Sequence, residues 1–187
     1  MRASLTLKMG QSMNQKTIRQ QVTDFWTHTG HGSMPEHSFA AWYLRQKYQI
    51  NDADAMRQSS DGNYDYGIDA YCLRSQEQRP TLILIQAKFT DILTTIAKGF
   101  QDLKRFLPVL ERALESNEAS VPIENKVLTN LRGDLNRLDK QTKDRLHFEF
   151  AVIHLCDDEK DVIDKHNRHP VGDGRSQPGS IRQVEPI

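Results

Sequence analysis

Two apolar runs separated by a short polar loop constrain the fold of this 187-residue chain more than any other feature. Residues 68–74 read IDAYCLR, residues 82–89 read LILIQAKF, and SQEQRP lies between them. Short runs rich in isoleucine, leucine and aromatic residues on both sides of a polar loop are typical of a β-hairpin. The sequence therefore predicts two antiparallel strands inside a fold that covers them.

Pairing that is symmetric about the loop centre predicts the register of this hairpin. In that register Tyr71 faces Leu84 and Asp69 faces Gln86, so each pair shares one face of the sheet. Lys88 lies two residues beyond Gln86 and belongs to the same face. The opposite face is expected to be wholly apolar and to consist of Ile68, Ala70, Cys72, Ile83, Ile85 and Ala87. Three polar side chains thus converge at the open end of an apolar hairpin.

These three side chains suggest a hydrolytic centre. Asp69 can bind a divalent cation through oxygen, and Gln86 can add a neutral oxygen ligand, a set that suits magnesium with retained waters. Such a metal stabilises charge on a phosphate and acidifies a bound water. Lys88 could hold or deprotonate the attacking water, or neutralise the transition state. An ordinary ion pair between Asp69 and Lys88, solvated by Gln86, is the alternative.

Helical periodicity precedes the hairpin. Ile18, Val22 and Phe25 recur at helical spacing and predict a short amphipathic helix. A second helix is expected over 36–48, because Pro35 suits a first helical turn and a run of apolar residues follows it. These two helices are expected to bury their apolar side chains against the sheet.

The segments around and after the hairpin complete the predicted order of elements. A short irregular strand is expected over 55–58, and a long helix after the hairpin is expected to bend or break at Pro108. Residues 117–145 carry helical spacing, and 147–155 (HFEFAVIHL) predict a buried strand. Because helices separate this strand from 82–89 and both are apolar on both faces, a parallel pair joined by a crossover is expected.

Composition limits the classes of function. Lysine plus arginine and aspartate plus glutamate each number 25, so overall charge gives no support for nucleic-acid binding, although a local basic face stays possible. Cys72 and Cys156 have no metal or redox spacing and are interpreted as free thiols in a reducing compartment. No signal peptide or membrane span is apparent, so we expect a cytoplasmic protein without a membrane partner.

Other side chains that often carry chemistry favour structural roles. His28 and His31 have no partners that complete a zinc pattern and are interpreted as surface residues. His154, in the last predicted strand, is interpreted as a core histidine. Trp42 and Tyr43 at helical spacing are interpreted as core aromatic residues rather than platforms for stacking bases.

An aspartate on one strand, a short hairpin and then (E/Q)-x-K at the end of the next strand resemble the PD-(D/E)XK nuclease superfamily. The segment DGNYDYGIDAYCL, followed by LILIQAKF, resembles the amino-terminal region of AIPR-type abortive phage infection proteins and, more loosely, Mrr-like restriction endonucleases. The match covers roughly residues 36–110, with support from 147–155. It implies an α/β fold with a restriction-endonuclease-like αβββαβ core, whose mixed central sheet is flanked by helices.

The resemblance implies divalent-metal-dependent cleavage of nucleic acid, expected to be DNA, in abortive infection or restriction of phage. Asp69 matches the metal-binding aspartate, Gln86 the second acidic position in its glutamine variant, and Lys88 the motif lysine. Glu36, at a helix start, is the candidate for the acid that completes a Mg²⁺ or Mn²⁺ site, and the carbonyl of Ala87 is a further ligand. Glutamine at position 86 leaves the site with one negative charge fewer.

The long helix after the motif lysine carries cations that could meet backbone phosphates, namely Lys98, Lys104 and Arg105. A solvated helix face is the alternative for these residues. We divide the chain into a helical extension over 1–33, a nuclease-like domain over 34–169 and a disordered tail over 170–187. The superfamily also makes a homodimer conceivable.

The alternative function is a catalytically inactive nuclease-fold module that binds nucleic acid or protein. Two features favour it: the glutamine in the motif, and a length shorter than that of AIPR-type proteins. On this hypothesis the chain is a truncated member of the family.

Overall fold

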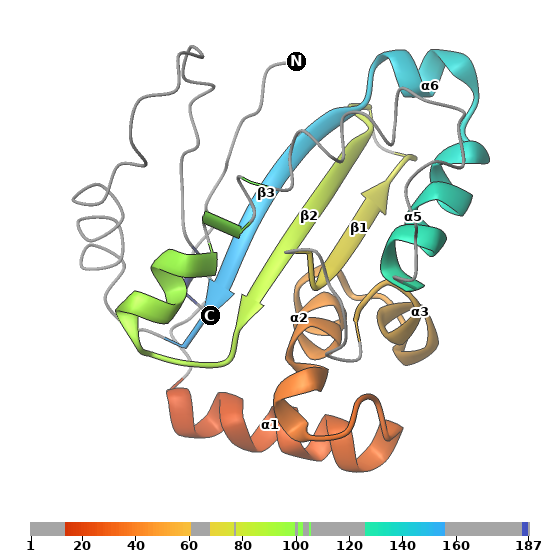
Figure 1. Cartoon of the computed structure of the whole chain (residues 1–187). Coiled ribbons are helices and arrows are strands. Elements are labelled where there is room, and N and C mark those ends of the chain that lie inside the picture. The colour runs from red at the N-terminus through yellow and green to blue at the C-terminus, as the bar shows by residue number, and fades with distance from the viewer. Residues whose placement is uncertain are drawn as a thin grey trace, which may run out of the picture.

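A mixed β-sheet with helices on both faces forms the centre of the molecule (Figure 1). The computed structural model describes residues 14–60, 68–76, 78–99, 101–102, 105, 126–155 and 185–186. Its helices are α1 (Gln15–Thr29), the 3₁₀ helix η1 (Pro35–Ser38), α2 (Phe39–Tyr48), α3 (Asp52–Arg57), α5 (Lys126–Asn136) and α6 (Lys140–Asp144). Its strands are β1 (Ala70–Arg74), β2 (Thr81–Lys88), β3 (His147–His154) and β4 (Glu185–Pro186). Residues 93–99 and 101–102 are also helical.

The hairpin register predicted from the sequence is confirmed. β1 and β2 pair antiparallel with Tyr71 opposite Leu84. The ladder ends at Ala70 opposite Ile85, and the Asp69 N–H donates to the carbonyl of that same Ile85 at 2.8 Å. β2 pairs with β3 in parallel along its whole length, as far as Lys88. The predicted parallel neighbour is therefore also confirmed, and the sheet is mixed.

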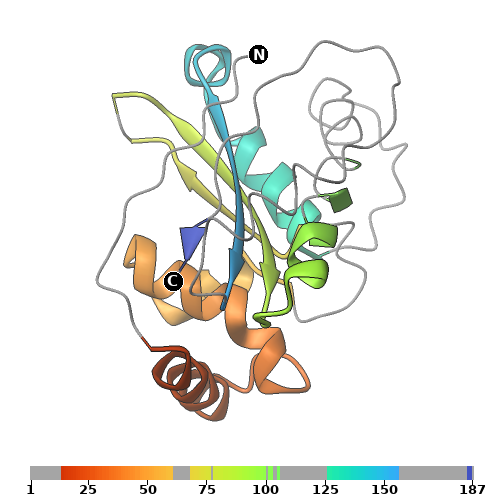
Figure 2. The ribbon, with the colours of Figure 1, turned by 90° about the vertical axis from the view of Figure 1, so that its left-hand side faces the viewer.

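Different helices cover the two faces of the sheet (Figure 2). On one face, α1, α2 and α3 pack over residues that include Ala70, Cys72, Ile83, Ile85 and Ile153. On the other face, α5 and the helical residues 93–99 pack over Tyr71, Leu82, Leu84, Phe150 and Val152. Because neither face of the central strands meets solvent, their apolar runs are nearly continuous. Cys72, Trp42 and Tyr43 are buried as expected, and Cys72 forms no disulfide within the described part of the chain.

Local signals account for the first helices. The Asn14 side chain caps α1 by accepting the Lys16 N–H at 2.8 Å. Gly30 ends α1 in the left-handed conformation at φ 66°, and its N–H donates to the Trp26 carbonyl. The predicted second helix is confirmed over 39–48, whereas its first turn is 3₁₀.

The strand predicted over 55–58 is wrong. These residues belong to α3 and its end, because the Asn51 side chain accepts the Asp54 N–H at 2.8 Å and acids in the first turn favour a helix. Ser59 forms an isolated bridge to Ala70, flanked by the Gln58 carbonyl, which accepts the Tyr71 N–H at 3.0 Å, and by the Ser60 N–H, which donates to the Asp69 carbonyl at 2.7 Å. Among the described residues, the strand expected before the hairpin is thus reduced to a single bridge.

Two expectations about burial are also wrong. Ile68 packs in the cluster with Tyr71 rather than on the Ala70 face, because β1 begins at residue 70 and strict alternation does not extend outside it. His31 is only 8% exposed rather than on the surface. Its Nε2 lies 3.1 Å from the Ser60 carbonyl and 3.0 Å from the Ser59 hydroxyl, contacts that the sequence pattern did not indicate.

A polar network fastens α5 to α3 and β1. The Arg57 guanidinium donates two hydrogen bonds to the Asp134 carboxylate, at 2.9 and 3.1 Å. The Tyr71 hydroxyl donates to the same carboxylate at 2.7 Å. Asn130 donates to the Arg57 carbonyl at 2.7 Å. Burial, together with the Asp134 carboxylate, raises the pKa of Tyr71, and the hydrogen bond to Asp134 raises the pKa of Arg57. We call Arg57, Tyr71 and Asp134 the docking network.

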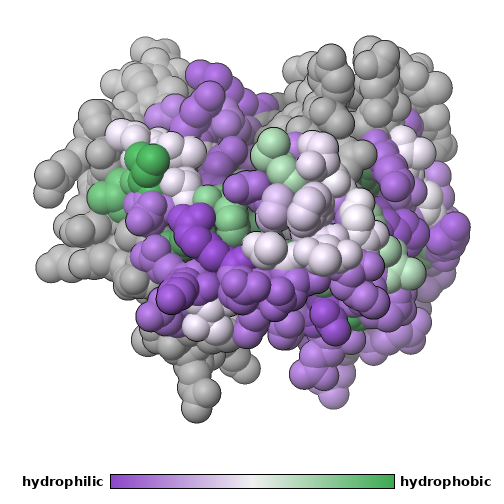
Figure 3. Space-filling model, turned by 90° about the horizontal axis from the view of Figure 1, so that it is seen from below, coloured by the Kyte–Doolittle hydropathy of each residue, from purple (hydrophilic) through white to green (hydrophobic). Residues whose placement is uncertain are grey.

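Several predictions concern residues outside the described ranges. These include the helix around Pro108, most of the tail, Lys104 and Cys156. Two residues of the predicted tail are described, and they pair with the end of β3 as β4. Within the described ranges, no helix is long and apolar enough to cross a membrane. Seen from below, the described surface is mostly hydrophilic, with apolar atoms only in small separate areas (Figure 3).

Candidate functional site

A pocket of about 340 Å³ lies at the carboxyl end of β2. Its walls include four residues that the sequence singled out for a catalytic or metal site, namely Glu36, Asp69, Ala87 and Lys88. These residues come from η1, from the segment before β1 and from the end of β2. The fold therefore brings together side chains that lie far apart in the sequence.

The end of β2 positions Lys88. The Thr90 N–H donates to the Lys88 carbonyl at 2.6 Å, and the Thr90 carbonyl accepts the Leu155 N–H at 3.0 Å. In the parallel ladder Lys88 pairs with His154, which is fully buried. The strand thus ends in a tight turn with Lys88 as its last residue. Burial lowers the pKa of His154 to about 4, so this neighbour of Lys88 is uncharged at neutral pH.

Asp69 is oriented by its neighbours across the hairpin. Gln86 donates through Nε2 to Asp69 Oδ2, and the Ala87 N–H donates to the same oxygen at 2.5 Å. The backbone of Asp69 is held as well, because its carbonyl accepts the Ser60 N–H at 2.7 Å. The side chains of Asp69 and Gln86 therefore meet as predicted, and the Ala87 contact is made through its N–H.

Gln86 is 1% exposed, and its Oε1 has no hydrogen-bond partner in the described part of the chain. An unsatisfied buried amide oxygen costs about 1–3 kcal/mol. A divalent cation is one group that would satisfy such an oxygen. The carboxylates of Asp69 and Glu36 line the pocket, and oxygen donors of this kind suit Mg²⁺ or Mn²⁺ rather than a soft metal, whereas Gln86 itself does not line the pocket.

The supply of anionic ligands is small. The described residues contain no group of three or more histidine, cysteine, aspartate or glutamate side chains close enough to hold a metal. Glu36 is exposed on η1, and Asp69 is half-buried. Magnesium is commonly held by one or two carboxylates together with waters and substrate oxygens, and the pocket lining has two carboxylates, those of Asp69 and Glu36.

Aromatic contacts connect the pocket to α1 and α2. Phe89 lines the pocket and packs against Phe39, with the two ring centroids 5.0 Å apart. The guanidinium of Arg19 lies 5.0 Å over the Phe89 ring, within the range of a cation–π contact. His31 contacts the carbonyl of Ser60, a residue that also lines the pocket.

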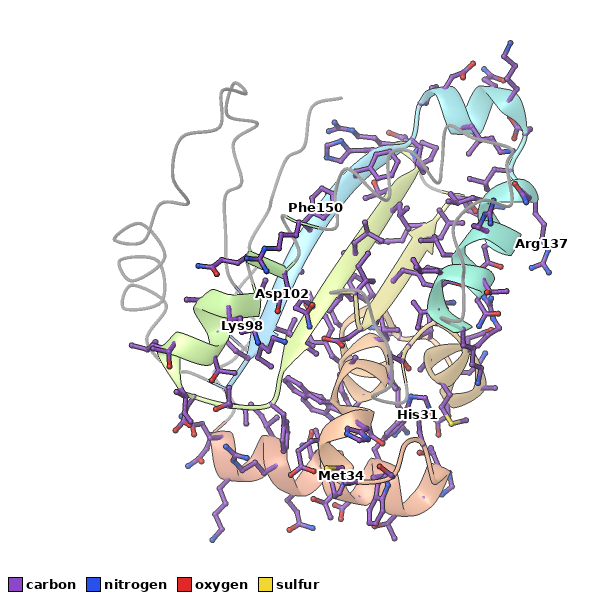
Figure 4. All side chains as sticks on the ribbon, viewed as in Figure 1. His31, Met34, Lys98, Asp102, Arg137 and Phe150 are labelled. Carbon is purple, nitrogen blue, oxygen red and sulfur yellow. The ribbon has the colours of Figure 1, made fainter. Side chains whose placement is uncertain are left out.

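The predicted phosphate-binding cations are less closely associated with the pocket. Lys98 is exposed on the helical residues 93–99, beside the lower ends of β2 and β3 in Figure 4, and does not line the pocket. Arg105 is exposed, and Lys104 lies outside the described residues. Basic groups on this helix remain a prediction for substrate contact.

Several residues that line the pocket were not indicated by the sequence. They are His37, Ala40, Ser60, Phe89, Thr90 and Thr95. His37 follows Glu36 directly, and Phe89 and Thr90 follow the motif lysine, so adjacency could have found them. Ser60 and Thr95 carry no such signal, because only packing brings them to this end of the sheet.

Comparisons of the chain with protein-family models, with curated proteins and with solved structures found no match. The fold and the pocket therefore define a class only at a coarse level. The chain has a mixed α/β fold with a three-stranded central sheet packed against helices, and a polar pocket at the end of the middle strand. The likeness to PD-(D/E)XK nucleases rests on the sequence pattern alone.

Proposed function

We propose that this chain is a divalent-metal-dependent nuclease domain of the PD-(D/E)XK type that hydrolyses phosphodiester bonds, with DNA as the expected substrate. One observation carries the proposal: Asp69, Lys88 and Glu36 line a single pocket, and Gln86, which does not line it, donates a hydrogen bond to Asp69. An acid, an amide and a lysine at the end of two paired strands form the pattern that such nucleases use.

Each residue has a role in this proposal. Asp69, the Gln86 amide oxygen, Glu36 and the Ala87 carbonyl would hold Mg²⁺ or Mn²⁺. When bound, the metal supplies charge stabilisation at the phosphate and an acidified water. Lys88 orients or deprotonates the attacking water and offsets negative charge in the transition state.

The topology supports a restriction-endonuclease-like core within the α/β class. An antiparallel hairpin is followed by a helical crossover to a parallel strand, and helices cover both faces. The reduced first strand, a bridge at Ser59, is the departure from the αβββαβ order. The proposed role is defence against phage by abortive infection or restriction, which places the protein in the cytoplasm.

The test is cleavage of plasmid, linear and single-stranded DNA and of RNA, with magnesium or manganese, by wild type and by Lys88→Ala. We expect metal-dependent cutting that falls at least about a hundredfold in Lys88→Ala, because the water and the phosphate lose their cation. Lys140→Ala, which removes an exposed lysine of α6, is the matched control and keeps full activity. Equal cutting by Lys88→Ala and wild type would contradict the assignment.

A non-catalytic module that binds nucleic acid or protein is the second candidate. It is favoured by one observation: the Asp69 carboxylate already accepts two N–H groups, one of them from the Gln86 that should bind metal. Calorimetric titration with magnesium and manganese separates the two candidates. Binding that disappears in Asp69→Asn supports the nuclease, whereas no binding by wild type favours the module.

A further inference from the structure

A glycine brings the helical residues 93–99 into direct contact with the motif lysine. Gly99 is buried, and a Cβ atom placed on it would lie 2.9 Å from Lys88 Cε and 3.2 Å from Lys88 Cγ. The same atom would lie 3.4 Å from Gln86 Cγ. Any side chain at position 99 would therefore occupy the space in which the stem of Lys88 lies.

The backbone at Gly99 does not itself require glycine. Gly99 lies in a helical stretch and has no left-handed φ, so an alanine would suit the local conformation and would favour the helix. Glycine at this position is therefore explained by the close approach to Lys88.

The contact falls on the part of Lys88 that matters for chemistry. The Lys88 backbone is held by pairing with His154 on β3 and by the Thr90 N–H. The stem beyond it contacts Gly99 near Cε, the atom that carries the ammonium nitrogen. Because the backbone is fixed, the packing around the stem decides where the ammonium lies in the pocket.

We propose that Gly99 is a positioning residue that holds the Lys88 ammonium in the pocket by leaving room for the lysine stem. Its effect on cleavage rests on the proposed function, whereas its effect on Lys88 does not. A methyl group at position 99 displaces the flexible end of Lys88 rather than the backbone, so the fold is retained while the ammonium moves.

The experiment compares Gly99→Ala with Gly133→Ala in protein labelled with [ε-¹³C]lysine. Gly133 lies in α5, where a Cβ would meet nothing within 4 Å, so it is a matched helical control. The Lys88 signal is assigned by its loss in Lys88→Arg. We expect this signal to shift in Gly99→Ala and not in Gly133→Ala. We also expect kcat to fall about a hundredfold in Gly99→Ala with little change in KM, because a small misplacement of a catalytic group has an effect of that size.

The outcomes separate the two proposals. A Lys88 signal that does not move in Gly99→Ala overturns the inference, whatever the activity. The wild-type protein could lack nuclease activity while the Lys88 signal still shifts in Gly99→Ala. That result supports the positioning contact and shows that the proposed function is wrong. If Gly99→Ala does not fold, the wild-type protein still decides: a nuclear Overhauser effect between the Gly99 Hα and the Lys88 ε protons supports the contact, and its absence overturns it.

Discussion

The docking network and the pocket are near neighbours on the hairpin, because Tyr71 lies two residues from Asp69, but their polar groups are satisfied in different ways. In the docking network, Asp134 accepts hydrogen bonds from both Arg57 and Tyr71 and joins three elements. At the pocket, Gln86 contacts Asp69 but keeps a buried oxygen without a hydrogen-bond partner. A satisfied network stabilises a fold, whereas an incomplete one beside a cavity suits a ligand.

The largest expected effect on stability comes from breaking the docking network. Asp134→Ala leaves Arg57 and Tyr71 facing each other without the carboxylate, and Asp134 itself is only 12% exposed. We expect the free energy of unfolding to fall by about 3 kcal/mol, toward the lower end for a buried ion pair because Arg57 is partly exposed. Urea denaturation measures it. Asp144→Ala, at an exposed position of α6, should change stability by less than about 0.5 kcal/mol. Equal effects of the two variants would contradict a stabilising role.

The next effect is a pH dependence at the pocket end. Burial lowers the pKa of His154 to about 4, below the value of about 6.5 expected in the unfolded chain. At pH values between these two pKa values, His154 binds a proton in the unfolded state but not in the folded state. The free energy of unfolding is therefore highest above pH 6.5 and falls as the pH decreases. We expect a loss of about 2 kcal/mol between pH 7 and pH 5.

Urea titrations at several pH values measure this loss. His154→Gln should remove most of the slope. His147, whose pKa is also lowered by burial and by Arg79, leaves a smaller slope of the same sign. An unchanged slope in His154→Gln would show that another group carries the pH dependence.

The smallest expected effect sharpens the contrast between the two regions. Gln86→Glu restores the acid that is more common in the motif and places a second carboxylate beside Asp69. We expect magnesium affinity to rise about tenfold, or about 1.4 kcal/mol, because affinity for hard cations follows the charge of the ligands. Isothermal titration calorimetry measures it, with Gln46→Glu as the control that adds the same charge at an exposed position of α2. An equal affinity for wild type and Gln86→Glu would count against a metal at this position.

Much of the hairpin was predictable because the information is local. Alternation and a symmetric loop suffice to place Tyr71 opposite Leu84 and to predict that the side chains of Asp69 and Gln86 meet. The helix α3 was missed because the capping signal at Asn51 is short and was outweighed by turn-forming residues nearby. His31 was misplaced because its burial depends on Ser59 and Ser60, which lie almost thirty residues further along the chain.

The sequence by itself determined the strand register, the parallel neighbour and the convergence of Asp69, Gln86 and Lys88, since each follows from periodicity within or between adjacent elements. Only the tertiary structure decided that Glu36, Ser60 and Thr95 line the same pocket and that Gly99 lies against the lysine stem. The physical reason is that these contacts join segments packed from opposite faces of the sheet. Their approach depends on side-chain volumes throughout the core, which no local pattern encodes.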